Sequence, residues 1–384
     1  MIRNSSINLN SFWAAILLSA GSFSVALPVN GITPFLLSLC LIYYLFSCKP
    51  KFNKTITFFV GFIFLYFLFS FLIIDDRTNS IKEYFVKFLF MGLSGLCLSQ
   101  LAVSPEKVIK YTVVISIVLL PFSFRLDFNE DTGIMMGISY YIIKFINAII
   151  LAFLYRITFF SKKTFLQQIG LVALLIVYCL FFVSFASRAA ILSILLFIVF
   201  SLIACSRKHT LLISLVIGAI GGVLYIYFFD ILKVVSDMAS NHGLNILAVD
   251  KMLYYLDDIS NGRDELYKKG LYMINENPLF GNGIASFENR FNTIYIHSIW
   301  LQLLIEGGLF FFVPIAIIVF LSFRYIMIDN NNQVNRLFVA YLISISLVQL
   351  TFSETFWRLQ YFWYYIGYTI QLYTSRNYKK YANG

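Results

Sequence analysis

The sequence predicts an all-α fold: a polytopic membrane bundle of about 12 transmembrane helices with one large, partly helical loop on the outer face. Of its 384 residues, 60% are hydrophobic and only 12% are charged, about half the charged fraction of a soluble domain. Most of the chain divides into apolar runs of the roughly 20 residues that cross a bilayer. The stretch 230–296 interrupts these runs. This composition excludes a soluble enzyme, a disordered chain and a coiled coil.

Nine spans are expected within residues 1–229 and three within 297–384, which end in a short tail. The first run follows a single basic residue and leads directly into the second, so we interpret it as an uncleaved anchor and not as a signal peptide. The fourth is the least regular, because Lys82, Glu83 and Lys87 lie in its first turns. The expected spans are 10–29, 31–48, 55–74, 82–103, 108–124, 134–157, 164–185, 188–205, 210–229, 297–323, 337–353 and 356–374.

The charges predict an orientation. The chain has 29 Lys and Arg residues against 19 Asp and Glu residues. With the N-terminus inside the cell, more than half of the basic residues fall in inner connections, as is usual for membrane proteins. Both termini are then cytoplasmic, and residues 230–296 form a loop on the outer face. The same preference explains the basic excess without a nucleic-acid partner.

The loop contains a candidate anion site. Asn261 to Glu265 have the pattern of a helix start, with Asn261 as the cap and acidic residues in the first turn. Arg263 therefore lies near a helix N-terminus, where a guanidinium and free backbone N–H groups together can bind phosphate. The alternative is an ion pair of Arg263 with a neighbouring aspartate, such as Asp257, Asp258 or Asp264.

Two more residues have an unusual place at the expected outer face. His297 lies where the loop re-enters the membrane, and an imidazole suits proton transfer near neutral pH. The alternative is an interfacial histidine that anchors a helix end. Arg188 stands between two spans that almost touch in sequence, where it faces either a polar cavity or the lipid headgroups. Two anion-binding residues and one base at a single face suit a lipid-linked phosphate substrate.

Lys144 and Glu306 lie inside expected spans and are possible supporting residues of a polar cavity. For Glu306 the alternative is a hydrogen-bonded role in helix packing. Lys87, near a span end, is expected to extend towards the headgroups. No metal-ligand cluster and no phosphate-binding glycine loop is found, so we expect neither a metal nor a cofactor.

The chain resembles the O-antigen polymerase and O-antigen ligase superfamily. The resemblance covers the C-terminal half well, whereas the N-terminal half matches only in hydropathy. It is carried by the order and spacing of these motifs: Ser187-Arg188-Ala189, Gly262-Arg263, Asn277-Pro278-Leu279-Phe280-Gly281-Asn282-Gly283, His297-Ser298 and Glu306-Gly307-Gly308.

This resemblance implies a metal-independent membrane glycosyltransferase. Its substrate would be an oligosaccharide on undecaprenyl pyrophosphate, used at the periplasmic face of a bacterial inner membrane among membrane lipids. Arg188 and Arg263 would hold the pyrophosphate, and His297 would assist the attacking hydroxyl. A chain-length regulator protein is a partner that the resemblance allows.

Several functions stay open at this point. We favour a polymerase, which extends one lipid-linked repeat with another. A ligase that transfers the glycan to lipid A-core and a capsular or exopolysaccharide polymerase share the same chemistry. A flippase or other transporter of lipid-linked oligosaccharides also fits twelve spans, although its two halves would be expected to resemble each other. A non-catalytic chain-length protein would not explain His297.

Overall fold

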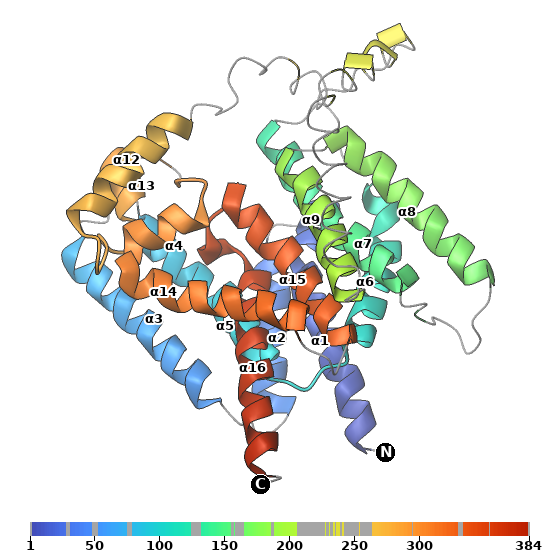
Figure 1. The fold of residues 1–384 in the computed structure, drawn as a ribbon, viewed down its shortest axis with the longest axis horizontal. Coiled ribbons are helices and arrows are strands. Elements are labelled where there is room, and N and C mark those ends of the chain that lie inside the picture. The colour runs from blue at the N-terminus through green and yellow to red at the C-terminus, as the bar shows by residue number, and fades with distance from the viewer. Residues whose placement is uncertain are drawn as a thin grey trace.

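The computed structural model describes residues 2–27, 31–47, 53–74, 79–123, 132–154, 157, 165–185, 188–205, scattered positions between 227 and 253, 263–293, 295–328, 333–352 and 354–382. Every regular element within these ranges is helical (Figure 1), which confirms the all-α prediction. The elements are α1 (Ile2–Ala26), α2 (Ile32–Ser47), α3 (Lys54–Ile73), α4 (Ser80–Lys87), the π-helix η1 (Phe88–Gly92), α5 (Leu93–Ser99), α6 (Pro105–Ser123), α7 (Thr132–Leu154), α8 (Phe165–Phe185), α9 (Arg188–Cys205), α12 (Arg263–Glu276), α13 (Ser286–Phe291), α14 (Ile299–Ile328), α15 (Gln333–Phe352), the 3-10 helix η2 (Phe356–Arg358) and α16 (Gln360–Ala382).

Several of these helices are long and apolar enough to cross a membrane. Five candidate spans are found in the described residues, at Ser5–Ala26, Lys54–Ile73, Phe165–Phe182, Ile299–Ile328 and Gln333–Phe352. Shorter apolar helices lie at Ile32–Ser47, Ile138–Leu154 and Ala190–Cys205. The chain is therefore a multi-pass membrane protein, whereas the count of twelve spans stays a prediction. The predicted span 210–229 falls almost wholly outside the described residues.

The bundle is built around α15. Nearly all its side chains from Arg336 to Leu350 are buried, against α9, α14, α16 and α7. The outer helices instead expose large apolar side chains, including Phe46, Phe58 and Phe165, which are 86%, 79% and 80% exposed. Such surfaces are unfavourable in water and suit a hydrocarbon environment.

A close crossing of α5 and α16 fixes the position of the turn that precedes α16. At Gly95, an added Cβ would lie 2.5 Å from the carbonyl oxygen of Gln360. At Gly367, it would lie 2.0 Å from the Ser99 hydroxyl. Small residues allow helix backbones to approach in this way. The turn 354–358 is thereby held beside α4.

Helix α14 is interrupted at Gly308, and the end of the long loop supplies hydrogen-bond partners for the backbone groups that the interruption leaves unpaired. Gly308 has φ 57° and ψ −159°, a conformation that is essentially restricted to glycine. A break of this kind frees backbone carbonyl and N–H groups that must find other partners when buried. The segment 278–283 supplies them. The backbone bonds are Asn282 N to Ile305 O (2.7 Å), Gly283 N to Glu306 O (2.9 Å), Leu309 N to Pro278 O (2.9 Å) and Phe310 N to Leu279 O (3.0 Å).

The glycines of the two motifs are required by this contact. A Cβ at Gly281 would lie 2.4 Å from the carbonyl oxygen of Glu306, and a Cβ at Gly308 would lie 2.5 Å from the backbone of Leu279. The Asn277–Gly283 and Glu306–Gly308 motifs therefore form one structural unit. This unit fixes the C-terminal part of the loop, including α13 and His297, on α14.

Candidate active site

His297 immediately precedes α14 in a strained backbone conformation. Its φ is 58°, in the left-handed region that histidine enters more often than most residues but still rarely. The imidazole packs against the ring of Tyr295, with centroids 4.3 Å apart. Its Nδ1 is buried and has no hydrogen-bond partner among the described residues. The ring is thus held in place with a buried, unpaired Nδ1.

Arg263 is the first residue of α12, two residues after the predicted cap Asn261, which lies outside the described residues. Burial lowers the pKa of His297 to about 4, and the positive charge of Arg263 contributes to the shift. The imidazole is consequently neutral at physiological pH. The described residues contain no ion pair of Arg263, and the alternative partners Asp257 and Asp258 lie outside them. Arg263 is therefore within electrostatic reach of His297.

Arg188 is the first residue of α9. Its side chain and the preceding Ser187 lie outside the described residues. Helix α9 itself packs on α15, α7 and α14. The participation of Arg188 in a site with Arg263 and His297 stays a prediction.

Glu306 is fully buried and hydrogen-bonded. Its Oε1 accepts from Gln302 Nε2 at 2.8 Å and from the backbone N of Ala285 at 3.3 Å, and its Oε2 accepts from Trp357 Nε1 at 2.9 Å. Its exposed fraction is 1%. The carboxylate therefore joins the loop, α14 and the turn before α16. These contacts support a positioning role in helix packing.

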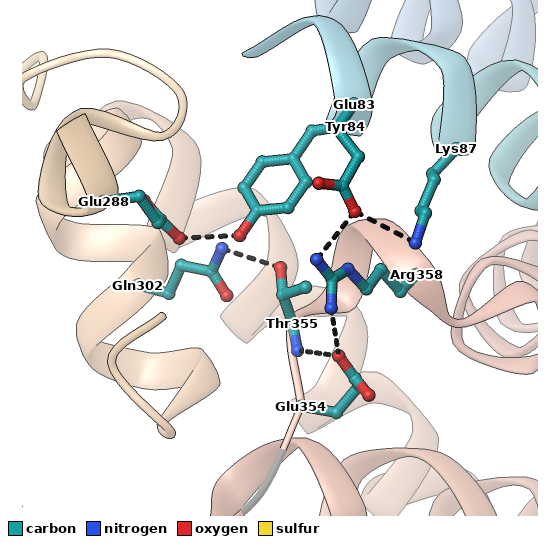
Figure 2. Close-up of polar contacts among 8 residues, drawn as sticks. All are labelled: Glu83, Tyr84, Lys87, Glu288, Gln302, Glu354, Thr355 and Arg358. Carbon is teal, nitrogen blue, oxygen red and sulfur yellow. Dashed lines mark hydrogen bonds and ion pairs between the residues drawn. The ribbon is translucent and has the colours of Figure 1, made fainter. Parts of the chain in front are cut away.

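A second buried carboxyl group lies on α13. Glu288 accepts a hydrogen bond from the Tyr84 hydroxyl at 2.7 Å (Figure 2), while its Oε2 has no partner in the described parts of the chain. Burial raises the pKa of Glu288 to about 7, although the Tyr84 hydrogen bond lowers it. The pair joins the loop to α4.

The turn 354–358 carries a charged network that sequence reasoning missed. Figure 2 shows Arg358 between two carboxylates, with Glu83 at 2.7 Å and Glu354 at 3.9 Å. Lys87 lies 3.0 Å from Glu83. The backbone N of Thr355 donates to Glu354 Oε1 at 3.1 Å. Lys87 thus has a carboxylate partner.

Tyr295 links this network to His297. Burial raises the pKa of Tyr295 to about 12, the Glu354 carboxylate adds to the rise, and the charges of Arg358 and Arg263 oppose it. Tyr295 therefore lies within the electrostatic reach of both arginines and of Glu354, while its ring contacts His297. The loop, α12 and the turn before α16 meet at this point.

The signal that could have identified Arg358 and Glu354 is present in the sequence. Both lie in or beside a very short connection between two apolar runs, which is the feature that singled out Arg188. For Glu288 the sequence offers no comparable signal, because its burial depends on how α13 docks.

Lys144 lies apart from these groups, in the middle of α7. Its side chain is 1% exposed, and its Nζ has no hydrogen-bond partner in the described residues. The ammonium lies over the rings of Tyr141 and Tyr361, at 4.7 and 4.2 Å from their centroids. Such cation–π contacts stabilise a buried cation only in part.

The arrangement supports acid–base and anion chemistry at one place. The neutral imidazole of His297 is within electrostatic reach of the Arg263 guanidinium, and Tyr295, which packs on it, is within reach of Glu354 and Arg358. Within the described ranges, no group of three or more His, Cys, Asp or Glu side chains is placed to hold a metal ion.

Comparison with known protein families gives a match over part of the chain. Residues 171–316 match the family model described as O-antigen ligase. The matched segment runs from α8 into α14 and includes Arg188, Arg263 and His297, whereas Glu354 and Arg358 follow it. No curated protein and no solved structure matches the chain. The family match supports the assignment of the chain to the O-antigen ligase and polymerase superfamily, whose members are membrane glycosyltransferase-like enzymes.

Proposed function

We propose that this protein is an O-antigen polymerase that works at the periplasmic face of the bacterial inner membrane. It transfers a growing glycan from undecaprenyl pyrophosphate to the non-reducing end of a new lipid-linked repeat. The observation that carries the proposal is the neighbourhood of Arg263 and His297, since the charge of the arginine reaches the imidazole. Both termini would be cytoplasmic. Figure 1 shows the two termini at one end of the molecule and α12 and α13 away from it.

The proposed reaction needs a base and a stabilised leaving group. The acceptor hydroxyl attacks the anomeric carbon of the donor, and the bond from that carbon to the pyrophosphate oxygen breaks. His297 accepts the hydroxyl proton, which its neutral form can do. Arg263, with Arg188 as the second predicted cation, stabilises the departing pyrophosphate. The two guanidinium groups would neutralise the charge of the departing pyrophosphate, as a divalent cation does in many other glycosyltransferases. Neither a metal nor another cofactor is therefore expected.

The remaining predicted residues would act indirectly. Glu306 would position His297, because it binds Gln302 in the first turns of α14 and Ala285 in the loop. Lys144 would support the site from within the bundle. Membrane lipids and a chain-length regulator protein would be the partners of the whole protein.

A ligase that transfers the glycan to lipid A-core is the second candidate. The description of the matching family model favours it. A capsular or exopolysaccharide polymerase would use the same groups on a different repeat. The choice of a polymerase rests on the resemblance, since superfamily polymerases are diverse and rich in aromatic residues, and 18% of this chain is aromatic.

Reconstitution tests these alternatives. The protein is placed in liposomes in the presence of a chelator. The substrate is the lipid-linked oligosaccharide, purified from cells that lack this protein. Glycan ladders are then compared for wild type, His297→Ala and Arg263→Ala. Wild type should form the ladder, and both variants should lose at least about 100-fold in rate.

Lys269→Ala is the matched control, because Lys269 is a second basic residue of α12 and its side chain is exposed. It should retain the wild-type rate. A requirement for added metal, or full activity of both site variants, would refute the mechanism. Addition of lipid A-core as an acceptor separates ligase from polymerase, and translocation of the lipid without lengthening would indicate a flippase.

A further inference from the structure

Among the residues that the structure describes, Glu354 makes its polar contacts with only one carboxylate oxygen. Both of its contacts in Figure 2 use Oε1, which accepts from the backbone N of Thr355 at 3.1 Å and faces Arg358 at 3.9 Å. Within the described parts of the chain, Oε2 has no hydrogen-bond or ion-pair partner. The side chain is 26% exposed. The carboxylate is therefore oriented by one oxygen and can bind a ligand with the other.

The free oxygen lies near the proposed base. Thr355, the residue after Glu354, accepts a hydrogen bond from Gln302 Nε2 at 2.8 Å (Figure 2). The backbone N of Gln302 in turn donates to the carbonyl oxygen of Ser298 at 2.9 Å, one residue after His297. The ring of Tyr295 packs on His297 with centroids 4.3 Å apart, and the Glu354 carboxylate acts on Tyr295 electrostatically. Tyr295 is itself partly exposed. The turn that carries Glu354 is therefore anchored on the start of α14, where Tyr295 and His297 lie.

The chemistry of this group fits a sugar and not a phosphate. A carboxylate accepts hydrogen bonds from hydroxyl groups, and an aromatic ring offers an apolar surface for the C–H face of a sugar ring. The same carboxylate would repel a pyrophosphate, which belongs with Arg263. Binding sites commonly combine a few placed polar groups with aromatic walls in this way.

We propose that Glu354 and Tyr295 form the binding subsite for the acceptor sugar, in which Glu354 Oε2 accepts a hydrogen bond from an acceptor hydroxyl and the Tyr295 ring forms the wall. This inference rests on the proposed function, since it places the acceptor opposite the pyrophosphate and next to His297. Arg358 is a positioning residue here. It holds Glu354 through Oε1, and its own charge is shared with Glu83.

The test measures binding and transfer separately. The binding probe is the free oligosaccharide, released from its lipid carrier and titrated into purified full-length protein. The transfer assay varies the concentration of the lipid-linked acceptor at saturating donor. Glu354→Gln keeps the size and the Thr355 contact but removes the charge, so it should weaken oligosaccharide binding and raise the acceptor KM by roughly 10- to 100-fold. Donor binding should stay unchanged.

Glu83→Gln is the matched control, because it removes the other carboxylate of Arg358 and leaves Oε2 in place. It should change oligosaccharide binding by less than about twofold. Tyr295→Ala removes the aromatic ring of the proposed subsite and should also weaken binding.

Equal oligosaccharide binding by wild type and Glu354→Gln, or no binding by wild type, would overturn the proposal. An equal loss in Glu83→Gln and Glu354→Gln would also overturn it, because the carboxylate would then act only through Arg358. A wild-type protein that binds the oligosaccharide through Glu354 but forms no ladder would refute the proposed polymerase and leave the sugar subsite standing.

Discussion

Arg263 lies close enough to His297 for its charge to act on the imidazole. Burial is the main cause that lowers the pKa of His297 to about 4, and the positive charge of Arg263 is the second. The histidine is therefore neutral in the absence of an anion. A pyrophosphate bound to Arg263 would offset this charge and make the imidazole a stronger base. In the proposed mechanism, donor binding thus prepares the base for the acceptor.

Removal of the Arg263 charge should raise the pKa of His297. In Arg263→Gln the effect of burial remains and the electrostatic part is lost, so the titration should move from about 4 towards the ordinary value. Because the chain has three histidines, replacing His209 and His242 by Gln leaves a single signal in ¹³C-histidine NMR. Lys269→Gln is the control and should not move it. An unchanged titration in Arg263→Gln would show that the two groups do not interact.

The stability of the protein should fall as pH rises towards 7 because of Glu288. The carboxyl has its pKa raised by burial to about 7 from an ordinary value of 4.5. Between these values the folded protein binds a proton that the unfolded chain releases, so stability decreases with pH and then levels off above 7. Glu288→Gln should make this slope less steep in thermal unfolding between pH 5 and 8. Glu276→Gln, at the exposed ion pair with Arg290, should preserve it.

Loss of the Glu306 carboxylate should destabilise the protein strongly. Glu306→Ala leaves Gln302, Trp357 and the backbone of Ala285 without their acceptor in a buried place. Each such donor costs about 1–3 kcal/mol, so the free energy of unfolding should fall by at least about 3 kcal/mol. Glu306→Gln, which retains one acceptor oxygen, should recover part of the loss. Reversible unfolding in detergent measures the loss in the free energy of unfolding. A loss below about 1 kcal/mol for Glu306→Ala would contradict the hydrogen-bond network.

The interruption of α14 at Gly308 should be essential for the stability of the fold. Gly308→Ala would place a Cβ 2.5 Å from the Leu279 backbone at a positive φ, and we expect a loss of at least about 3 kcal/mol or failure to fold. Gly61→Ala is the matched control, since an added Cβ there meets nothing within 4 Å. It should leave stability unchanged or raise it by about 0.5–1 kcal/mol. Similar behaviour of the two variants would refute the role assigned to the break.

Much of the fold was predictable because it depends on local properties. Apolar runs identified the helices, and the residues 263–276 have the spacing of the helix that begins at Arg263. The break at Gly308 does not follow from the sequence, although both motifs that form it are visible there. Its cause is a backbone pairing between 278–283 and 305–310, and no local pattern reveals such a contact.

Part of the candidate site can be proposed from the sequence. The charge pattern assigns Arg263 and His297 to the outer face, and this assignment stays a prediction. Glu288 and Glu354 could not be identified in this way, because their significance comes from what packs on them after folding. An acidic residue next to a helix end has many ordinary explanations until its partners, Tyr84 and Arg358, are known.

Replacement of the buried Lys144 should have opposite effects on the stability of the protein and on its activity. A buried ammonium without a hydrogen-bond partner loses its hydration, and the rings of Tyr141 and Tyr361 replace only part of it. Lys144→Met removes the charge at similar volume and should raise the free energy of unfolding by at least about 1 kcal/mol. Lys87→Met is the control, because it breaks only the partly exposed pair with Glu83 and should cost less than about 1 kcal/mol. A more stable Lys144→Met that no longer forms the glycan ladder would show that the lysine is retained for activity. A destabilised variant would instead mean that the ammonium has a polar partner within the bundle.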